Sequence, residues 1–160
     1  MALEPIISKV AIRGHPIHPA MIHFPVATLI LLAGADVAYI FTDDAFWARA
    51  AVWLSGVGTL TGWAAGLAGL TDLLAMTRVR RLIAGWSHAI LAMMLLSIAT
   101  LNWLLRIADT ERYIIPWGLY LSLLSVGLIA AASYLGALLV YEFAIGVDTQ
   151  EAAQLHEKSI

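Results

Sequence analysis

The chain has 160 residues, of which 61% are hydrophobic and only 12% are charged, whereas ordinary soluble domains contain about 45–50% apolar and about 25% charged residues. This composition excludes a water-soluble globular fold, because so much apolar surface has no place in water. The net charge of −2, without a Lys/Arg-rich block or a Gly-rich phosphate loop, argues against nucleic acid as a partner, and the absence of cysteine excludes disulfides, thiolate metal sites and covalent haem attachment.

The first 18 residues predict an interfacial segment rather than a membrane span. Residues 5–13 form a short amphipathic stretch, with Ile6, Ile7 and Val10 on one side and Lys9 and Arg13 on the other. Residues 14–19 contain two His-Pro pairs, and each residue before a proline is pushed toward extended geometry, so a stiff, non-helical segment is expected there. No short cleavable apolar segment precedes the first span, which we therefore expect in the mature protein.

Four long apolar runs follow, at about residues 19–41, 46–76, 82–106 and 114–145. About 20 consecutive apolar residues suffice to cross a bilayer. The sequence therefore predicts an all-α, integral membrane four-helix bundle over residues 19–145 as one domain, embedded in the lipid bilayer. Residues 146–160 are expected to form a polar tail.

The distribution of basic residues predicts the orientation. With four spans, both termini and the loop between the second and third helices share one side. That side carries Lys9, Arg13, Arg78, Arg80, Arg81 and Lys158, whereas the other carries Arg49, Arg106 and Arg112. By the positive-inside rule, the termini are expected on the cytoplasmic side of a bacterial inner membrane.

Two patterns predict helix packing. In the second helix, Gly58, Gly62 and Gly66 recur every four residues, and small residues at this spacing let helix backbones approach closely. In the first helix Asp36 has no histidine nearby, and we expect it to pair with Arg106 or Arg112.

Four of the five histidines fall near the predicted cytoplasmic ends of the spans, with His156 in the tail. His23 lies roughly 6 Å into the first helix and His88 roughly 8–9 Å into the third, at 1.5 Å per residue. His15 and His18 precede the first helix, while Asp72 and Glu142 approach the same level. Imidazoles and charges are costly in hydrocarbon unless paired, hydrated or bound to a ligand, so their convergence predicts a functional layer.

Three interpretations of this layer stay open. His23 and His88, on facing helices at equal depth, suit the axial ligands of a b-type haem in an electron-transfer protein. A divalent transition metal bound for sensing, delivery or transport suits His15, His18, His23, Asp72 and His88. In the third, the chain is a non-catalytic membrane assembly subunit, in which the small-residue stripe of the second helix docks partners and the histidines are structural. Taken singly, Asp72 and Glu142 are expected to cap helix ends or meet arginines. A nucleophile with its base is not recognisable, which argues against a hydrolase.

Residues 14–25, GHPIHPAMIHFP, resemble the opening motif of a bacterial family of predicted membrane proteins known as domain of unknown function 2231. Three further features are similar to later landmarks of that family. They are Gly69-Leu70-Thr71-Asp72, His88, and the run from Tyr134-Leu135-Gly136 to Leu139-Val140-Tyr141. The chain departs from the family pattern after that tyrosine, where Glu142-Phe143-Ala144 stands in place of Arg-His-Gly.

The resemblance implies membrane electron transfer, because related domains occur beside or fused to Rieske and c-type cytochrome modules. It would make the histidines ligands of haem or metal, and the quinone pool a source or acceptor of electrons. A role for a histidine at position 143 does not transfer to this chain, where Glu142 is the nearest substitute. A homo-oligomer is also compatible, with the first helix of one copy facing the third helix of another.

Overall fold

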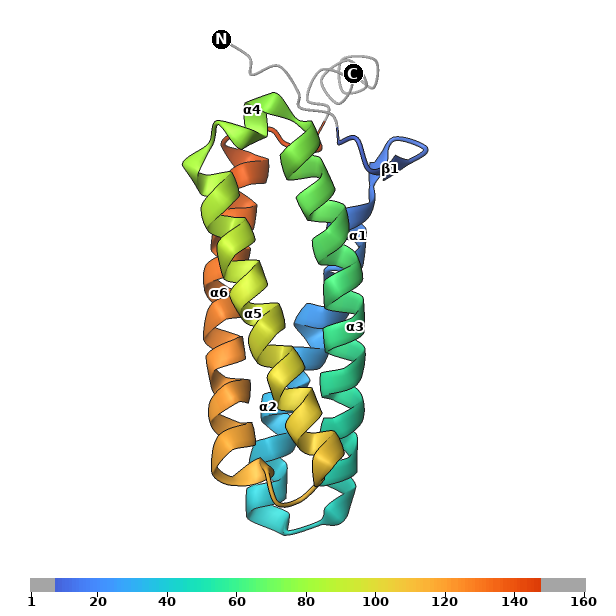
Figure 1. The fold of residues 1–160 in the computed structure, drawn as a ribbon, viewed down its shortest axis with the longest axis vertical. Coiled ribbons are helices and arrows are strands. Elements are labelled where there is room, and N and C mark those ends of the chain that lie inside the picture. The colour runs from blue at the N-terminus through green and yellow to red at the C-terminus, as the bar shows by residue number, and fades with distance from the viewer. Residues whose placement is uncertain (1–7, 148–160) are drawn as a thin grey trace, which may run out of the picture.

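The computed structural model describes residues 8–147, and they are almost entirely helical, as expected for an all-α protein. A two-stranded hairpin comes first, followed by long helices with short helical segments before, between or after some of them (Figure 1). In chain order the elements are β1 (Ala11–Ile12), β2 (His15–Pro16), α1 (Ile17–Met21), α2 (His23–Thr42), α3 (Ala45–Ala75), α4 (Thr77–Arg80), α5 (Ile83–Ala108), the π-helical turn η1 (Ile114–Gly118) and α6 (Leu119–Tyr141).

The N-terminal segment differs from the sequence-based expectation in two ways. Residues 11–16 form the two strands and the turn of a hairpin, whereas residues 5–7 of the predicted amphipathic stretch and residues 148–160 of the predicted tail lie outside the described residues. The predicted non-helical segment ends earlier than expected, because α1 begins at Ile17. Pro19 is tolerated there because the first turn of a helix does not use the missing N–H.

The connection between α2 and α3 shows how local sequence sets helix boundaries. Asp43 ends α2 in the left-handed conformation, with φ of 50°. The carboxylate of Asp44 accepts a 2.8 Å hydrogen bond from the backbone N–H of Phe46 and so caps the start of α3. The predicted polar connection at these two aspartates is therefore confirmed.

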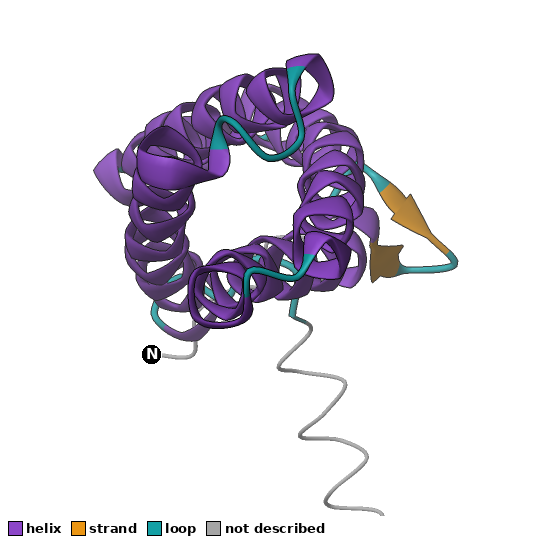
Figure 2. Ribbon diagram, turned by 90° about the horizontal axis from the view of Figure 1, so that it is seen from below, coloured by secondary structure: helices purple, strands orange, loops and turns teal. Residues whose placement is uncertain are grey.

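The four long helices α2, α3, α5 and α6 lie side by side and surround a common axis when viewed from one end (Figure 2). α2 packs against α3 and α6, while α5 packs against those same two helices from the opposite side. α2 and α5 are therefore diagonal to each other, as are α3 and α6. Both α4 and the hairpin lie at one end, here called the α4 end (Figure 1).

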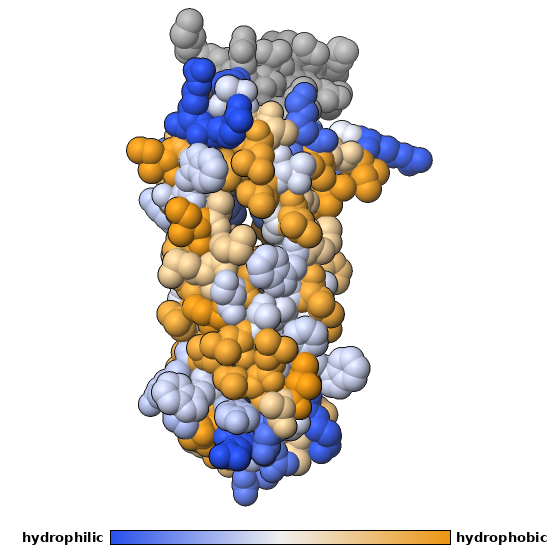
Figure 3. Space-filling model, viewed as in Figure 1, coloured by the Kyte–Doolittle hydropathy of each residue, from blue (hydrophilic) through white to orange (hydrophobic). Residues whose placement is uncertain are grey.

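Among residues 8–147, three helical segments are long and apolar enough to cross a membrane, namely Ile17–Thr42, Ile83–Ala108 and Ile114–Tyr141. They expose large apolar side chains, and orange surface runs between blue ends in Figure 3. α3 is not among these candidates, although it is the longest helix at 31 residues. Its glycines, threonines and charged ends lower its mean hydropathy, so a fourth span stays a prediction.

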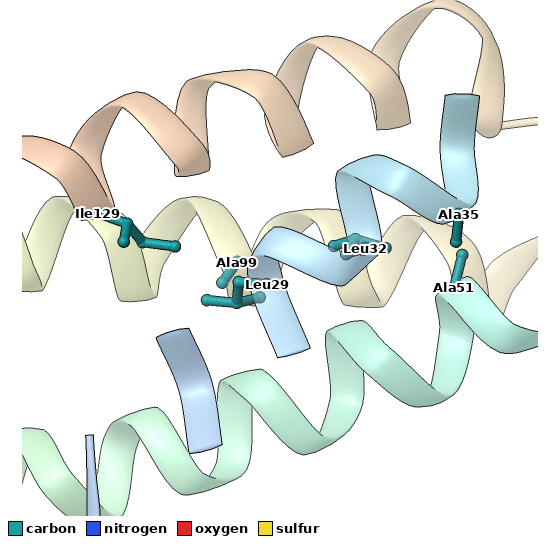
Figure 4. Packing of buried hydrophobic residues seen from close by; sticks show 6 residues of the cluster. All are labelled: Leu29, Leu32, Ala35, Ala51, Ala99 and Ile129. Atoms are coloured by element: carbon teal, nitrogen blue, oxygen red, sulfur yellow. The ribbon is translucent and has the colours of Figure 1, made fainter. Parts of the chain in front are cut away.

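The apolar core joins the four long helices. Leu29, Leu32 and Ala35 of α2 meet residues from α3, α5 and α6 (Figure 4). The glycines of α3 bring these helices together, as predicted. A Cβ at Gly58 would lie 2.8 Å from the side chain of Leu29, and Gly62 and Gly66 lie in the same way against Leu96 of α5.

Candidate functional site

The hairpin leads directly into the short helix that carries His18. Ala11 pairs with Pro16 and Ile12 with His15, and the turn between them uses positive φ at Arg13 and Gly14. The backbone N–H of Ile17 then donates a 3.0 Å hydrogen bond to the carbonyl of Val10. This bond fixes the start of α1 one residue before His18.

The imidazole of His18 rests on α3. Its Nδ1 lies 2.8 Å from the carbonyl oxygen of Ala65, and its ring covers Gly69, one helical turn further along. A Cβ at Gly69 would lie 2.8 Å from Nδ1, so a side chain larger than hydrogen would displace the ring. Glycine at position 69 therefore makes the room that this hydrogen bond needs.

The imidazole of His88 repeats this arrangement on α6. Its Nδ1 lies 2.9 Å from the carbonyl oxygen of Ala132, and its ring lies against Gly136, again four residues after the acceptor. A Cβ at Gly136 would lie 3.4 Å from Cε1 of His88, which is less crowded than at Gly69. Each histidine thus bonds a backbone carbonyl and covers the glycine of the next turn.

His18 and His88 meet between the helices. Their ring centroids are 6.0 Å apart and their planes are nearly perpendicular, at 89°. His18 precedes α2 and His88 lies in α5, so the two rings come from diagonal elements and bond to the other diagonal pair, α3 and α6. All four sides of the molecule therefore contribute to one layer.

The hydrogen bonds of these rings determine which nitrogen can bind a ligand. A carbonyl oxygen only accepts, so Nδ1 of each ring carries the proton, and in the neutral imidazole Nε2 keeps its lone pair. Metal-binding histidines show this same arrangement. With metal–nitrogen distances of about 2 Å, two imidazoles sharing one metal have centroids about 5–6.5 Å apart. The observed separation falls in this range.

Apolar side chains lie on both sides of the histidine layer. On the side of the α4 end, the buried side chains of Leu73, Met76 and Val79 pack with Leu70, Ala89 and Ile145. On the other side, Leu96 fills the space against Gly62 and Gly66. The half-buried imidazoles are therefore polar groups in apolar surroundings.

Asp72 has a different role from the one predicted for a metal ligand. It is 8% exposed, and its carboxylate accepts hydrogen bonds from the Ser8 hydroxyl at 2.6 Å and from the backbone N–H groups of Lys9 and Val10 at 2.8 and 3.0 Å. Asp72 therefore fastens the N-terminal segment to α3. Asp72 follows Ala65 by seven residues and Gly69 by three, so the three residues lie on one face of α3.

The other predicted ligands do not join His18 and His88. His15 is exposed and bonds the carbonyl of Arg13, while His23 is exposed and its Nδ1 lies 3.3 Å from the carbonyl of Ala20. Glu142 is exposed at the end of α6. Among residues 8–147, no three or more His, Cys, Asp or Glu side chains converge as they would around a metal ion.

The expected partner of His88 was His23, and the structure brings His18 there instead. The physical reason is the break between α1 and α2. Pro25 cannot donate to the carbonyl of Met21, and His23 becomes the first residue of a new helix with its ring directed outward. Sequence spacing placed His23 level with His88, whereas the structure places His18 against His88.

A second buried polar cluster lies toward the opposite end, where α2, α5 and α6 meet. The guanidinium of Arg106 donates to both carboxylate oxygens of Asp36, at 2.8 and 2.7 Å, and both side chains are fully buried. Asn102 and Ser122 bond these groups and the carbonyl of Gly118. The predicted pairing of Asp36 with Arg106 is confirmed.

Comparison with known protein families matches residues 14–149 to the family described as predicted membrane protein (DUF2231). The match begins at the turn of the hairpin and extends past α6, so it covers the histidine layer, Asp72 itself and the Asp36–Arg106 cluster, whereas the residues 8–10 that bond Asp72 precede it. No curated protein and no solved structure matches the chain.

Proposed function

Because this chain belongs to the DUF2231 family of predicted membrane proteins, we propose that it is a b-type haem-binding membrane protein that transfers electrons. His18 and His88 are the axial ligands in this proposal. The observation that carries it is their pairing, with ring centroids 6.0 Å apart and each Nδ1 bonded to a backbone carbonyl.

The donor set fits this cofactor. Two neutral imidazoles from opposite sides of a helical assembly are a common way to hold a haem iron, and the Nδ1–H bonds fix the orientation and raise the basicity of each Nε2. The neighbouring glycines leave room for the rings, and apolar residues lie on either side of the layer. When bound, haem supplies a one-electron couple between its ferric and ferrous forms.

The membrane arrangement proposed here includes α3 as a fourth span. At 1.5 Å per residue, its 31 residues extend about 46 Å, which exceeds the roughly 30 Å hydrocarbon core of a bilayer. It also packs between α2 and α5, two segments that qualify as spans. The basic residues then favour a bacterial inner-membrane protein with cytoplasmic termini.

The electron partners proposed are those that the family resemblance suggests. A quinone, a Rieske module or a c-type cytochrome module would give or accept the electron. The position of the histidine layer near the α4 end favours exchange at that end, which is the cytoplasmic end in the proposed orientation.

The same spacing of 6.0 Å also favours a second candidate, a single divalent transition metal bound by His18 and His88 with water completing its shell. The metal set predicted from sequence then loses His15, His23 and Asp72, which lie elsewhere or bond the N-terminal segment. Sensing, delivery or transport of the metal would be the function. A non-catalytic assembly subunit is the outcome in which neither cofactor binds.

The test is a dithionite-reduced minus oxidised absorbance spectrum of protein expressed with iron and haem precursor and purified in detergent. We expect the sharp bands of low-spin b-type haem in the wild type, and the loss of these low-spin bands in His18→Ala and in His88→Ala. His23→Ala and His15→Ala are matched controls, because their rings are exposed, and they should keep the bands.

Other outcomes would overturn the proposal. Intact bands in His18→Ala together with lost bands in His23→Ala would restore the ligand assignment predicted from sequence. A flat wild-type spectrum with stoichiometric metal by elemental analysis would replace haem with the metal candidate. A flat spectrum without metal would leave the assembly subunit.

A further inference from the structure

We propose that Asp72 is a positioning residue for His18, acting through the N-terminal segment that it fastens to α3. We call the contacts of Asp72 with residues 8–10 the N-terminal latch. The geometric part of this inference stands by itself, whereas its consequence for haem rests on the proposed function.

The carboxylate of Asp72 accepts hydrogen bonds from the N–H groups of successive residues, as an anion does in a backbone nest. One oxygen accepts the successive N–H groups of Lys9 and Val10, and the other accepts the Ser8 hydroxyl. Hydrogen bonds to an ionised group are shorter and stronger than neutral ones. These three join parts of the chain more than 60 residues apart, so the latch is a tertiary contact.

The latch reaches His18 through one further hydrogen bond. Val10, which donates to Asp72, accepts the N–H of Ile17 with its carbonyl, and Ile17 precedes His18 in the chain. The imidazole then rests on Ala65 and Gly69, on the same face of α3 as Asp72. One face of α3 therefore receives the segment at the latch and the histidine ring two turns away.

The helix that carries His18 has little stability without these contacts. α1 has five residues, and an isolated helix of that length does not persist in water. It meets α2 at Ile22, whose backbone stays helical with φ of −63° and ψ of −18°, and Pro25 withholds one hydrogen bond at this junction. The place of His18 is therefore set by what α1 docks against.

His88 provides the contrast. It lies within α5, a continuous helix of 26 residues that packs against α3 and α6. One ring of the pair is therefore fixed by a long helix and the other by the latch. Weakening the latch should move His18 and leave His88 in place.

The first measurement is hydrogen exchange by mass spectrometry on the full-length, haem-free protein in nanodiscs. In Asp72→Asn, exchange across residues 8–22 should accelerate by about tenfold or more, because the charged acceptor is lost and an amide N–H₂ faces the donors. Ser8→Ala removes one bond of three and should accelerate it by a few-fold. Asp44→Asn is the matched control, an aspartate at the other end of α3, and should leave these residues unchanged.

The second measurement is the spin state of bound haem. Asp72→Asn should retain haem through His88 and convert part of it from six-coordinate low-spin to five-coordinate high-spin, which the absorbance spectrum distinguishes. Asp44→Asn should stay low-spin. A purely structural role for Asp72 would lower the amount of folded protein without changing the spin state of the remainder.

The results separate the two proposals. Accelerated exchange in a chain that binds no haem would support the latch and overturn the proposed function. Unchanged exchange in residues 8–22 of Asp72→Asn would overturn the latch, whatever the spectrum shows. If Asp72→Asn does not fold, Ser8→Ala decides, and unchanged exchange in that variant would also overturn the latch.

Discussion

The two polar regions inside this protein differ in how their hydrogen-bonding groups are used. In the Asp36–Arg106 cluster, a fully buried carboxylate and guanidinium bond each other, and Asn102 and Ser122 bond the remaining donors and acceptors. In the histidine layer, His18 and His88 each donate from Nδ1 to a backbone carbonyl, which leaves Nε2 available to bind a ligand.

This difference separates structural from binding roles. A closed network holds three helices together and has little capacity for another ligand, since its charges are already neutralised. In the histidine layer, one hydrogen bond from Nδ1 holds each ring and leaves the lone pair of Nε2 available for a ligand. His18 lies on the short helix α1, which packs against α3. Changes in the Asp36–Arg106 cluster should therefore mainly lower the stability of the protein, whereas changes in the histidine layer should mainly weaken ligand binding.

The largest effect is expected from Arg106→Ala. This change leaves the carboxylate of Asp36 buried without its partner, and breaking a buried ion pair in this way costs about 3–5 kcal/mol. Thermal unfolding in detergent, followed by circular dichroism, should show a large drop in Tm. Arg112→Ala is the control, because that exposed guanidinium only lies over the ring of Tyr113, and its effect should stay within about 0.5 kcal/mol. Equal losses in the two variants would contradict the structural role of the cluster.

The next effect concerns the glycines beneath the imidazoles. Gly69→Ala places a Cβ 2.8 Å from Nδ1 of His18, so the ring must leave the carbonyl of Ala65. Loss of such an orienting bond costs about 10–100-fold in cofactor affinity, measurable by haem titration. Gly136→Ala is less crowded, at 3.4 Å, and should cost less. Gly34→Ala, with nothing within 4 Å, is the neutral control, and an equal loss there would show that the effect is not local.

The sequence was sufficient for much of the fold and for part of the site. Long apolar runs predicted the helices, the paired aspartates predicted the turn at residues 43–44, and charge alone suggested the partner of Asp36. These features depend on local composition and on the charge of single residues, which can be read directly from one sequence.

The pairing of His18 with His88 depended on tertiary contacts that spacing does not encode. His18 and His23 lie one turn apart, and the choice between them is made by the break before α2 and by the docking of α1 on α3. The sequence did contain one indication of this pairing, because Gly69 and Asp72 lie three residues apart in a motif that resembles a landmark of the family. The roles of these two residues are visible only in the structure, where Gly69 accommodates the ring of His18 and Asp72 fastens residues 8–10.

A smaller effect is expected from His88→Leu in the haem-free protein. The substitution removes the bond to the Ala132 carbonyl but replaces a half-buried polar ring with an apolar side chain, so the free energy of unfolding should change by about 1 kcal/mol or less. Denaturant unfolding in detergent measures it, with Arg106→Ala alongside for scale. A loss as large as that of Arg106→Ala would make the histidine layer a structural network too.

The smallest effect is expected from Thr59→Val. Thr59 lies on α3 between Ala51, which belongs to the apolar core, and Ala65, which accepts the His18 bond. Among the described residues its buried hydroxyl has no hydrogen-bond partner. Valine has the same shape, so the free energy of unfolding should rise by about 1 kcal/mol, whereas Ser125→Ala, which removes a bond to the Leu121 carbonyl, should lower it by a similar amount. A loss of stability in Thr59→Val would contradict this, and would mean that a water bound to that hydroxyl lies between the two polar regions.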